Sequence, residues 1–212
     1  MCTSKHHRQR GLTLIELIVF IVIVSVGLVG LLSVFNVAVR GSADPMIRKQ
    51  MLSIAEALLE EVELQPFTYC DPTDATWATA TSATTGTPPT TCTSTVQGPG
   101  PTAGQVRVST TAAFNNVADY AGASGGGATT GLGDATHAIT DLDGNAMAPL
   151  GYTASIAIDA TAALGPAGNQ VTADGTAANM RVVRITVTVN HGTDSLTLEG
   201  YRTRYWPNDQ SW

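Results

Sequence analysis

The hydrophobic pattern of the chain begins with one long apolar run. Leu17–Val39 contains 23 residues and no charged side chain. As an α-helix this run would extend about 34 Å, more than the roughly 30 Å hydrocarbon core of a bilayer. A cleaved secretory signal has a shorter apolar region, about 7–15 residues, followed by an Ala-x-Ala-like site that this sequence lacks. The pattern predicts a membrane-spanning helix over residues 12–40, and an uncleaved signal anchor remains an alternative interpretation.

A second helical pattern follows an interruption at Gly41–Pro45. Asp44 is a favourable N-cap residue and Pro45 suits the first helical position, so a new helix is expected to start near Pro45. Pro66 would end it. Residues 41–66 therefore predict an amphipathic helix, whose apolar face consists of Ile47, Met51, Ile54, Ala55, Leu58 and Val62.

The next segment, residues 67–105, predicts a long loop. Between positions 73 and 95 it is dominated by Thr, Ala and Pro and has no strong period. Cys70 and Cys92 lie in this segment, whereas Cys2 lies before Gly11. In an oxidising compartment an even pair favours a disulfide, which here would close a loop of about 23 residues and contribute about 3 kcal/mol. Two free or metal-binding thiols are the alternative, although no His or Cys stands at zinc-ligand spacing.

Residues 106–212 predict a β-rich globular head. Val106–Val108 is a short strand candidate, Ala121–Gly133 predicts a flexible Gly-rich loop, and Tyr152–Ile158 alternates as a strand with one apolar face. Packing of the amphipathic helix on an antiparallel sheet gives an α+β architecture.

The clearest β pattern is a C-terminal hairpin. Val183–Val189 alternates between apolar and polar residues, and Asn190–Asp194 is the predicted turn. The return strand starts with Leu196 and Leu198. Gly200 is expected to introduce a β-bulge, which would shift the alternation toward Tyr201 and Tyr205.

Charge is divided at Gly11. Lys5, Arg8 and Arg10 precede it, whereas all 17 acidic residues follow it. Loss of these three basic residues leaves eight Lys and Arg against 17 Asp and Glu, a formal charge of −9. This charge argues against a nucleic-acid partner, which needs a basic surface, and it keeps an exported domain soluble. Positive charge before the membrane helix predicts a cytoplasmic N-terminus and an exported body.

The junction between the basic leader, residues 1–11, and the apolar run has a pattern of its own. Gly11 is followed by Leu12, and Glu16 is the one carboxylate at the start of the apolar helix. A carboxylate in apolar surroundings is unfavourable unless it is paired, so Glu16 needs a compensating group. The basic leader, Gly11, Glu16 and the long helix together resemble the class III signal of type IV prepilins and type II secretion pseudopilins.

This resemblance implies cleavage after Gly11 by prepilin peptidase and N-methylation of the new amino terminus at Leu12. It also implies that Glu16 pairs with this amine on a neighbouring subunit, which would favour docking in one axial register. In the alternative interpretation, Glu16 merely reaches the lipid head groups. Leu12 departs from the Phe that the family usually carries at the first mature position.

Three further segments resemble minor pilins of the MshD and PilV kind, the former from mannose-sensitive haemagglutinin (MSHA) pilus systems. They are Arg40–Pro45, Ala55–Val62 and Pro66–Pro72. This resemblance implies a type IV pilin-like fold and a single-pass inner-membrane prepilin with a periplasmic head. The implied partners are other pilin subunits, prepilin peptidase and a pilus assembly platform. Such a subunit enters a pilus in few copies and primes assembly or caps the tip.

Signals for other chemistry are weak. Asp141, Asp143 and Asn145 resemble the start of a calcium loop, but the distal Glu is missing and Asp-Gly-Asn is also an ordinary turn sequence. His137 and His191 are isolated. No phosphate-binding loop or nucleophile elbow is present, so we expect neither a cofactor nor enzymatic activity.

Four functions are therefore compared. A minor pilin is favoured, and a type II secretion pseudopilin shares its signal and fold. A pilus-tip adhesin would use the Thr- and Gly-rich loops for contact. A membrane-anchored enzyme would need a catalytic constellation that the sequence does not show.

Overall fold

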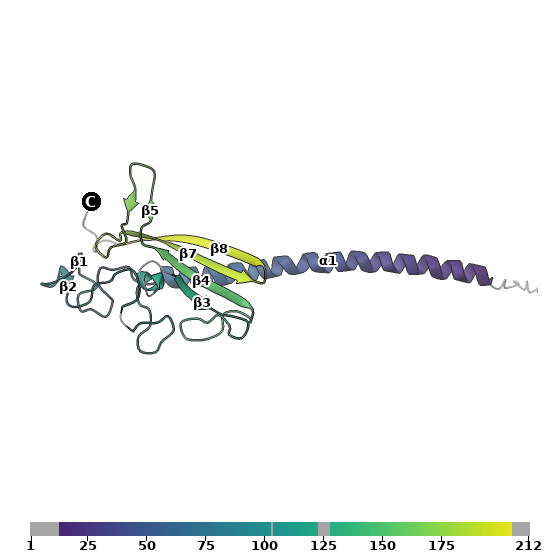
Figure 1. Cartoon of the computed structure of the whole chain (residues 1–212), viewed down its shortest axis with the longest axis horizontal. Coiled ribbons are helices and arrows are strands. Elements are labelled where there is room, and N and C mark those ends of the chain that lie inside the picture. The colour runs from purple at the N-terminus through teal and green to yellow at the C-terminus, as the bar shows by residue number, and fades with distance from the viewer. Residues whose placement is uncertain (1–12, 103, 123–127, 205–212) are drawn as a thin grey trace, which may run out of the picture. The chain divides into compact units, whose positions relative to one another are not determined.

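The structure is a computed structural model that describes residues 13–102, 104–122 and 128–204. The chain divides into two compact units, Met1–Met46 and Ile47–Trp212, and each is described by itself. Figure 1 shows helix α1 (Leu14–Glu63) and the strands that follow it in the sequence.

The first unit contains the apolar part of α1. The segment Leu14–Phe35 is long and apolar enough to cross a membrane, and its apolar side chains are exposed. An α-helix satisfies its backbone polar groups internally, which is the condition for crossing a bilayer. The hydroxyl of Ser25 is also satisfied within the helix, because it donates to the Ile21 carbonyl at 2.6 Å.

The predicted break between two helices is wrong. α1 continues through Gly41–Pro45, so residues 12–40 and 41–66 do not form separate helices, and Pro45 lies inside α1. Proline removes one backbone donor and crowds the carbonyl four residues earlier, here that of Gly41. This local loss does not outweigh the helical preference of the segments on either side. The helix ends at Glu63, shortly before Pro66.

In the second unit, the remainder of α1 packs on a four-stranded antiparallel sheet, which confirms the α+β fold. The predicted apolar face of this helix segment is buried from Met51 to Val62, and Ile47 is half-buried. The strand order is β3-β4-β7-β8. The strands are β3 (Ala128–Leu132), β4 (Tyr152–Asp159), β7 (Val182–His191) and β8 (Asp194–Thr203).

The two central strands supply the buried face of the sheet and confirm the predicted alternation. Each fully buried aliphatic side chain of this kind contributes about 1.5–3 kcal/mol. The C-terminal hairpin is also confirmed, with its two strands joined at the pair His191 and Asp194. The inward side chains of β4 and β7 are Tyr152, Ala154, Ile156, Ile158, Val183, Ile185, Val187 and Val189.

The predicted β-bulge at Gly200 is wrong. β7 and β8 pair without interruption from Val182 and Thr203 to His191 and Asp194, and Tyr201 stays on the exposed face. A Cβ on Gly200 would lie 2.5 Å from a carboxylate oxygen of Glu63 in α1. Gly200 therefore permits close approach of the helix to the strand. Tyr205 lies outside the described residues.

Two further β-structure predictions differ from the structure. Part of the predicted loop Ala121–Gly133 forms β3, which pairs with β4 and satisfies backbone groups along that side of the strand. Val106–Val108 forms no strand. Val106 makes an isolated bridge to Ala113, through backbone hydrogen bonds with Ala112 and Phe114, and the short turn between these segments leaves no further residues to pair.

Short elements occupy the connecting segments. The predicted loop 67–105 contains a small parallel sheet of β1 (Ser82–Thr85) and β2 (Thr91–Cys92). A buried 3₁₀-helix, η1 (Val117–Ala121), precedes β3. β5 (Ala163–Leu164) and β6 (Val171–Thr172) form an antiparallel pair between β4 and β7 in the sequence.

Candidate functional site

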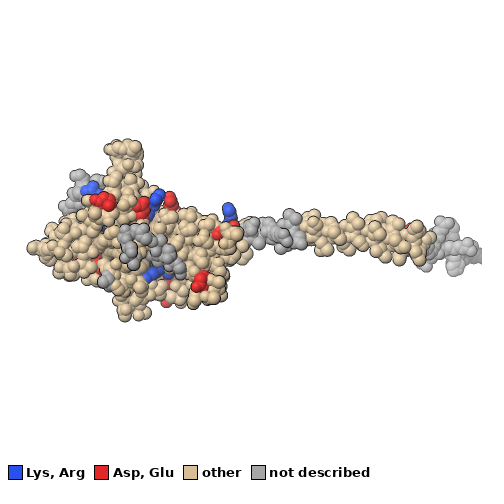
Figure 2. Space-filling view, viewed as in Figure 1, with Lys and Arg blue, Asp and Glu red and all other residues tan. Residues whose placement is uncertain are grey.

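The first turn of α1 carries the charged side chain of the apolar segment, Glu16. The hydroxyl of Thr13 accepts a hydrogen bond from the Glu16 backbone N–H at 3.3 Å and so caps the helix start. The neighbouring side chains of Leu14 and Ile15 are 77% and 72% exposed. Figure 2 shows uncharged surface along most of the described apolar segment. The carboxylate of Glu16 thus lies on an apolar helix that the described residues leave uncovered.

The Thr13-to-Glu16 spacing is a helix-start signal that the sequence analysis did not use. Ser or Thr followed three residues later by Glu is typical of a capped N-terminus. Acidic charge in the first turn also interacts favourably with the helix dipole. Gly11 and Leu12, the predicted cleavage and methylation positions, lie outside the described residues.

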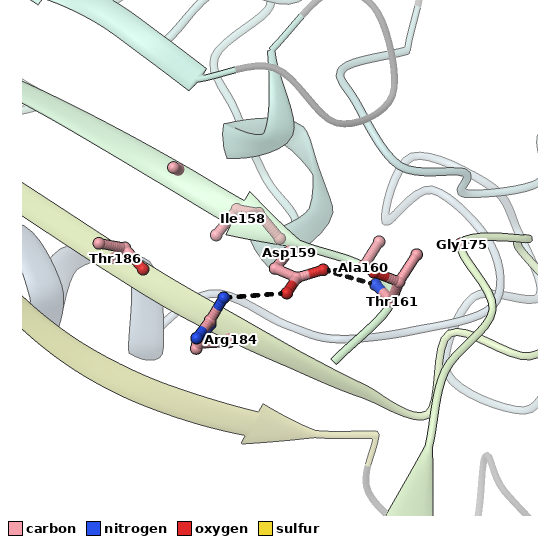
Figure 3. A pocket seen from close by; sticks show the side chains of 8 residues that line it. Ile158, Asp159, Ala160, Thr161, Gly175, Arg184 and Thr186 are labelled. Carbon is pink, nitrogen blue, oxygen red and sulfur yellow. Dashed lines mark hydrogen bonds and ion pairs between the residues drawn. The ribbon is translucent and has the colours of Figure 1, made fainter. Parts of the chain in front are cut away.

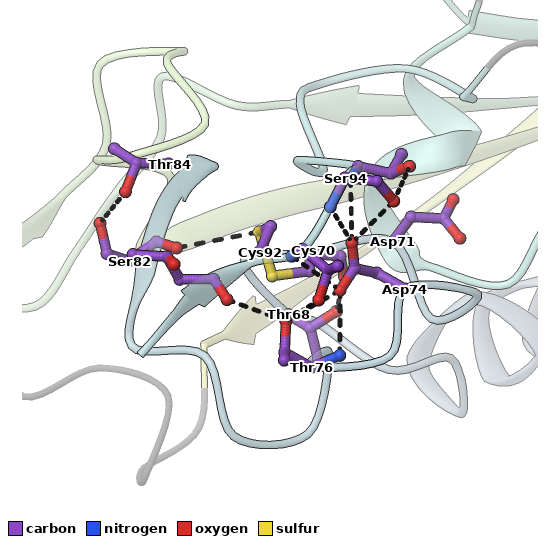
Figure 4. Close-up of a disulfide and its surroundings, with 12 residues drawn as sticks. Thr68, Cys70, Asp71, Asp74, Thr76, Ser82, Thr84, Cys92 and Ser94 are labelled. Atoms are coloured by element: carbon purple, nitrogen blue, oxygen red, sulfur yellow. Dashed lines mark hydrogen bonds between the residues drawn. A yellow bond between two sulfur atoms is a disulfide. The ribbon is translucent and has the colours of Figure 1, made fainter. Parts of the chain in front are cut away.

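The segment after α1 is closed by the disulfide between Cys70 and Cys92. Figure 4 shows Asp74 beside this bond, facing Thr76 and Ser94. Asp74 is buried and accepts backbone hydrogen bonds from Thr76, Thr93, Ser94 and Thr95 at 2.9, 3.1, 2.7 and 2.9 Å. Burial alone would raise the pKa of Asp74, but these donors outweigh it and hold that pKa well below its usual range. An ionised carboxylate therefore organises the disulfide-closed loop.

The same local structure recurs along the head. In each case one carboxylate oxygen of an Asp accepts hydrogen bonds from both the backbone N–H and the hydroxyl of the Thr two residues later, which fixes a turn. The repeated Asp-x-Thr pattern is visible in the sequence, although the sequence analysis missed it. The Asp residues are Asp71, Asp74, Asp134, Asp159 and Asp174.

A buried ion pair ties the loop before η1 to α1. Arg107 donates to both carboxylate oxygens of Glu61, at 2.8 and 2.5 Å, and the two side chains are 6% and 8% exposed. The hydroxyl of Tyr120 donates to the same carboxylate at 2.7 Å. Burial, reinforced by the negative charge of Glu61, raises the pKa of Tyr120 above its usual range. The cluster holds helix, loop and η1 together.

A shallow hollow of about 420 Å³ lies on the outer face of β4 and β7. Figure 3 shows Asp159 between Arg184 and Thr161 in this hollow. Asp159 accepts from Arg184 at 3.2 Å and from the Thr161 hydroxyl at 2.7 Å. These interactions stabilise the turn after β4.

The remaining predicted site residues lie apart from these clusters. Asp141 accepts from the backbone N–H groups of Asp143 and Asn145, at 3.0 and 2.7 Å, so its carboxylate builds an exposed turn. His137 is exposed beside Asp134, and His191 is the last residue of β7, where its ring stacks on Tyr152. The described residues contain no group of three or more His, Cys, Asp or Glu placed to hold a metal ion.

Comparison with known proteins concerns the N-terminal segment. Residues 6–32 match the family model described as the prokaryotic N-terminal methylation motif. No curated protein and no solved structure gives a significant match to the chain. The motif is that of structural proteins of pilin type, and it implies assembly with pilin subunits. Together with the apolar helix it indicates membrane anchoring. The chain therefore carries the signal of a type IV pilin-like or pseudopilin substrate of prepilin peptidase.

Proposed function

We propose that this protein is a minor type IV pilin of the MSHA kind, similar to MshD, that primes assembly of a surface pilus or is incorporated into it. Prepilin peptidase cleaves after Gly11 and methylates the amine of Leu12. Before assembly the protein is a single-pass inner-membrane protein, with its N-terminus in the cytoplasm and its head in the periplasm. The resemblance of the Arg40–Pro45, Ala55–Val62 and Pro66–Pro72 segments to minor pilins of the MshD kind supports this class. Location in the filament distinguishes it from a pseudopilin.

The observation that carries the proposal is the position of Glu16. Its carboxylate lies in a capped first turn, on an apolar helix that the described residues leave uncovered. In a lipid or packed-helix environment an unpaired carboxylate is unfavourable, so a cationic partner stabilises it. The methylated amine of Leu12 on an adjacent subunit supplies such a charge, and pairing with Glu16 selects one docking register along the assembling helices.

In this proposal the head remains a rigid domain after export. The disulfide-closed loop, the Glu61–Arg107 pair and the four-stranded sheet connect its segments. The assembly platform and neighbouring subunits are its partners, and no catalytic step is assigned to it.

The experiment compares Glu16→Ala with a matched control, Ser25→Ala, which alters another polar side chain of the same apolar segment. We expect both variants to be processed by prepilin peptidase. Glu16→Ala should be missing from sheared filaments, whereas Ser25→Ala should be recovered normally, because its hydroxyl bonds only within the helix. Normal recovery of Glu16→Ala in filaments would refute the pairing mechanism. If both processed proteins remain in the membrane, a pseudopilin is favoured instead.

A further inference from the structure

The tip of the disulfide-closed loop is a dense run of threonine and proline. Residues 84–90, the threonine tip, read Thr-Thr-Gly-Thr-Pro-Pro-Thr, and all of them are exposed. Mixed Thr, Ser and Pro of this kind is typical of segments that carry O-linked sugars. An ordinary polar turn can have the same composition, so the contacts of the hydroxyls distinguish the two.

The hydroxyls of the threonine tip contribute little to the fold. The hydroxyl of Thr84 shares one hydrogen bond, with the Ser82 hydroxyl at 3.2 Å. Among the described residues, the hydroxyls of Thr85, Thr87 and Thr90 have no hydrogen-bond partner. These oxygens are therefore neither occupied nor covered by the described part of the chain, and an enzyme can reach them.

Other exposed threonines of the head are engaged in the fold. In the exposed Asp-x-Thr turns, the threonine hydroxyl donates to the carboxylate of the Asp two residues earlier, at 2.6–2.7 Å. Such a hydroxyl can be modified only if this turn loses its hydrogen bond. The threonines of these exposed turns are Thr136, Thr161 and Thr176. Exposure alone thus does not make the threonine tip distinctive, whereas its unengaged hydroxyls do.

The threonine tip projects from a fixed base. The backbone N–H of Thr81 donates to the Thr90 carbonyl at 3.0 Å, and that of Gly86 donates to the Cys92 carbonyl at 3.1 Å. The disulfide to Cys70 then joins this base to the segment after α1. Figure 1 shows β1 and β2, which carry the base, at one end of the head. The loop therefore presents its threonines on a folded protein.

Charge is missing from the whole segment around the threonine tip. No charged residue lies between Asp74 and Arg107. Charged side chains normally keep a protein surface hydrated and apart from other molecules. Neutral sugars would supply this hydration here. Phosphoryl groups would instead place negative charges side by side on Thr84 and Thr85, with no basic residue in the segment to pair with them.

We propose that the threonine tip, residues 84–90, is a site of O-glycosylation, modified after export by a glycosyltransferase. A threonine hydroxyl oxygen attacks C1 of a sugar activated as a diphosphate. The bond between this oxygen and C1 forms, the bond between C1 and the phosphate oxygen breaks, and the diphosphate leaves. The hydroxyl proton passes to a base of the transferase. This chain supplies only the acceptor, and the inference rests on the proposed export of the head.

The test is mass spectrometry of the full chain, purified in detergent from the cells that make it naturally. We expect its intact mass to exceed that of the processed, disulfide-bonded chain by whole hexose or N-acetylhexosamine units. Electron-transfer fragmentation, which leaves sugars on the peptide, should place these units on the threonines of residues 84–90. The N-terminal peptide of the same digest reports processing separately. A sugar-free chain that begins at Leu12 refutes glycosylation alone, and a glycosylated chain that begins at Met1 refutes the pilin function alone.

Substitution provides the second arm of the test. Replacing Thr84, Thr85, Thr87 and Thr90 together by Ala should remove all of the added mass. The matched control, Thr136→Ala with Thr176→Ala, removes exposed hydroxyls of Asp-x-Thr turns and should keep it. The wild-type site map does not depend on whether either variant folds. The proposal is overturned if the wild-type chain carries no sugar, if its sugars lie outside residues 84–90, or if the added groups are phosphoryl groups.

Discussion

Replacing Arg107 by Met should destabilise the head strongly. The substitution keeps an apolar stem but removes the guanidinium that donates two hydrogen bonds to Glu61. The Glu61 side chain is only 8% exposed, so water cannot readily replace the lost partner. The Tyr120 hydroxyl remains as a donor at 2.7 Å, but it carries no positive charge.

The expected loss of unfolding free energy follows from the burial of both side chains, Arg107 and Glu61. Removing one partner of a buried ion pair typically costs about 3–5 kcal/mol, because an uncompensated charge remains. Arg184→Met is the matched control. Its pair with Asp159 is 40% and 36% exposed, so its loss should cost about 1 kcal/mol or less. Adding Glu61→Gln to Arg107→Met removes the buried charge and should restore most of the lost stability.

The assay is urea unfolding of the full chain in detergent, followed by near-ultraviolet circular dichroism at pH 7. The reasoning predicts a large loss for Arg107→Met, a small one for Arg184→Met and a partial recovery in the double variant. If Arg107→Met costs no more than Arg184→Met, or if Glu61→Gln adds its full cost instead of rescuing, the ion pair does not hold the loop to α1.

Three further predictions concern the head. Replacing Cys70 and Cys92 together by Ser should cost about 3 kcal/mol in urea unfolding, from the entropy of the opened loop; a loss below about 1 kcal/mol would contradict this. Gly133→Ala should lower the melting temperature far more than Gly104→Ala. Both glycines have positive φ, but of the two only Gly133 would place a Cβ 2.5 Å from a backbone oxygen. Equal changes in melting temperature would show that this contact relaxes. The contribution of Asp119 to stability should fall as pH rises from about 4 to about 6, because burial raises the folded-state pKa of Asp119 to about 6 and the native state then binds the extra proton. Melts of Asp119→Asn should lack this component, and an unchanged pH profile would refute it.

The strand pattern could be predicted where burial follows a strict period of two. In β4, and in β7 from Val183 to Val189, the inward residues are apolar and the residues between them are more exposed, so the alternation identified both strands. β3 could not be found this way, because its sequence Ala-Thr-Thr-Gly-Leu has no such period and its pairing depends on the adjacent edge of β4. The predicted bulge at Gly200 was wrong because the reason for this glycine lies in another element. A side chain at position 200 would collide with Leu59 and Glu63 of α1.

The polar clusters show a similar limit. Glu61 and Arg107 stand 46 residues apart, and no local pattern relates them. The buried position of Asp119 likewise depends on residues from separate segments, including Gln97. The Asp-x-Thr turns are different, because the two hydrogen bonds that define each turn join residues two positions apart, and this spacing is visible in the sequence. At the N-terminus, the basic leader, Gly11, Glu16 and the apolar run follow one another closely in the sequence. They identified the methylation motif without any information about the head.

Mass spectrometry of the N-terminal peptide tests the central claim most directly. Sheared surface filaments and the membranes left behind are digested separately and searched for the peptide that begins at Leu12. The account predicts this peptide in the filaments, with a methylated amine and no leader. An intact N-terminus at Met1 in both fractions would contradict it and leave a plain signal anchor.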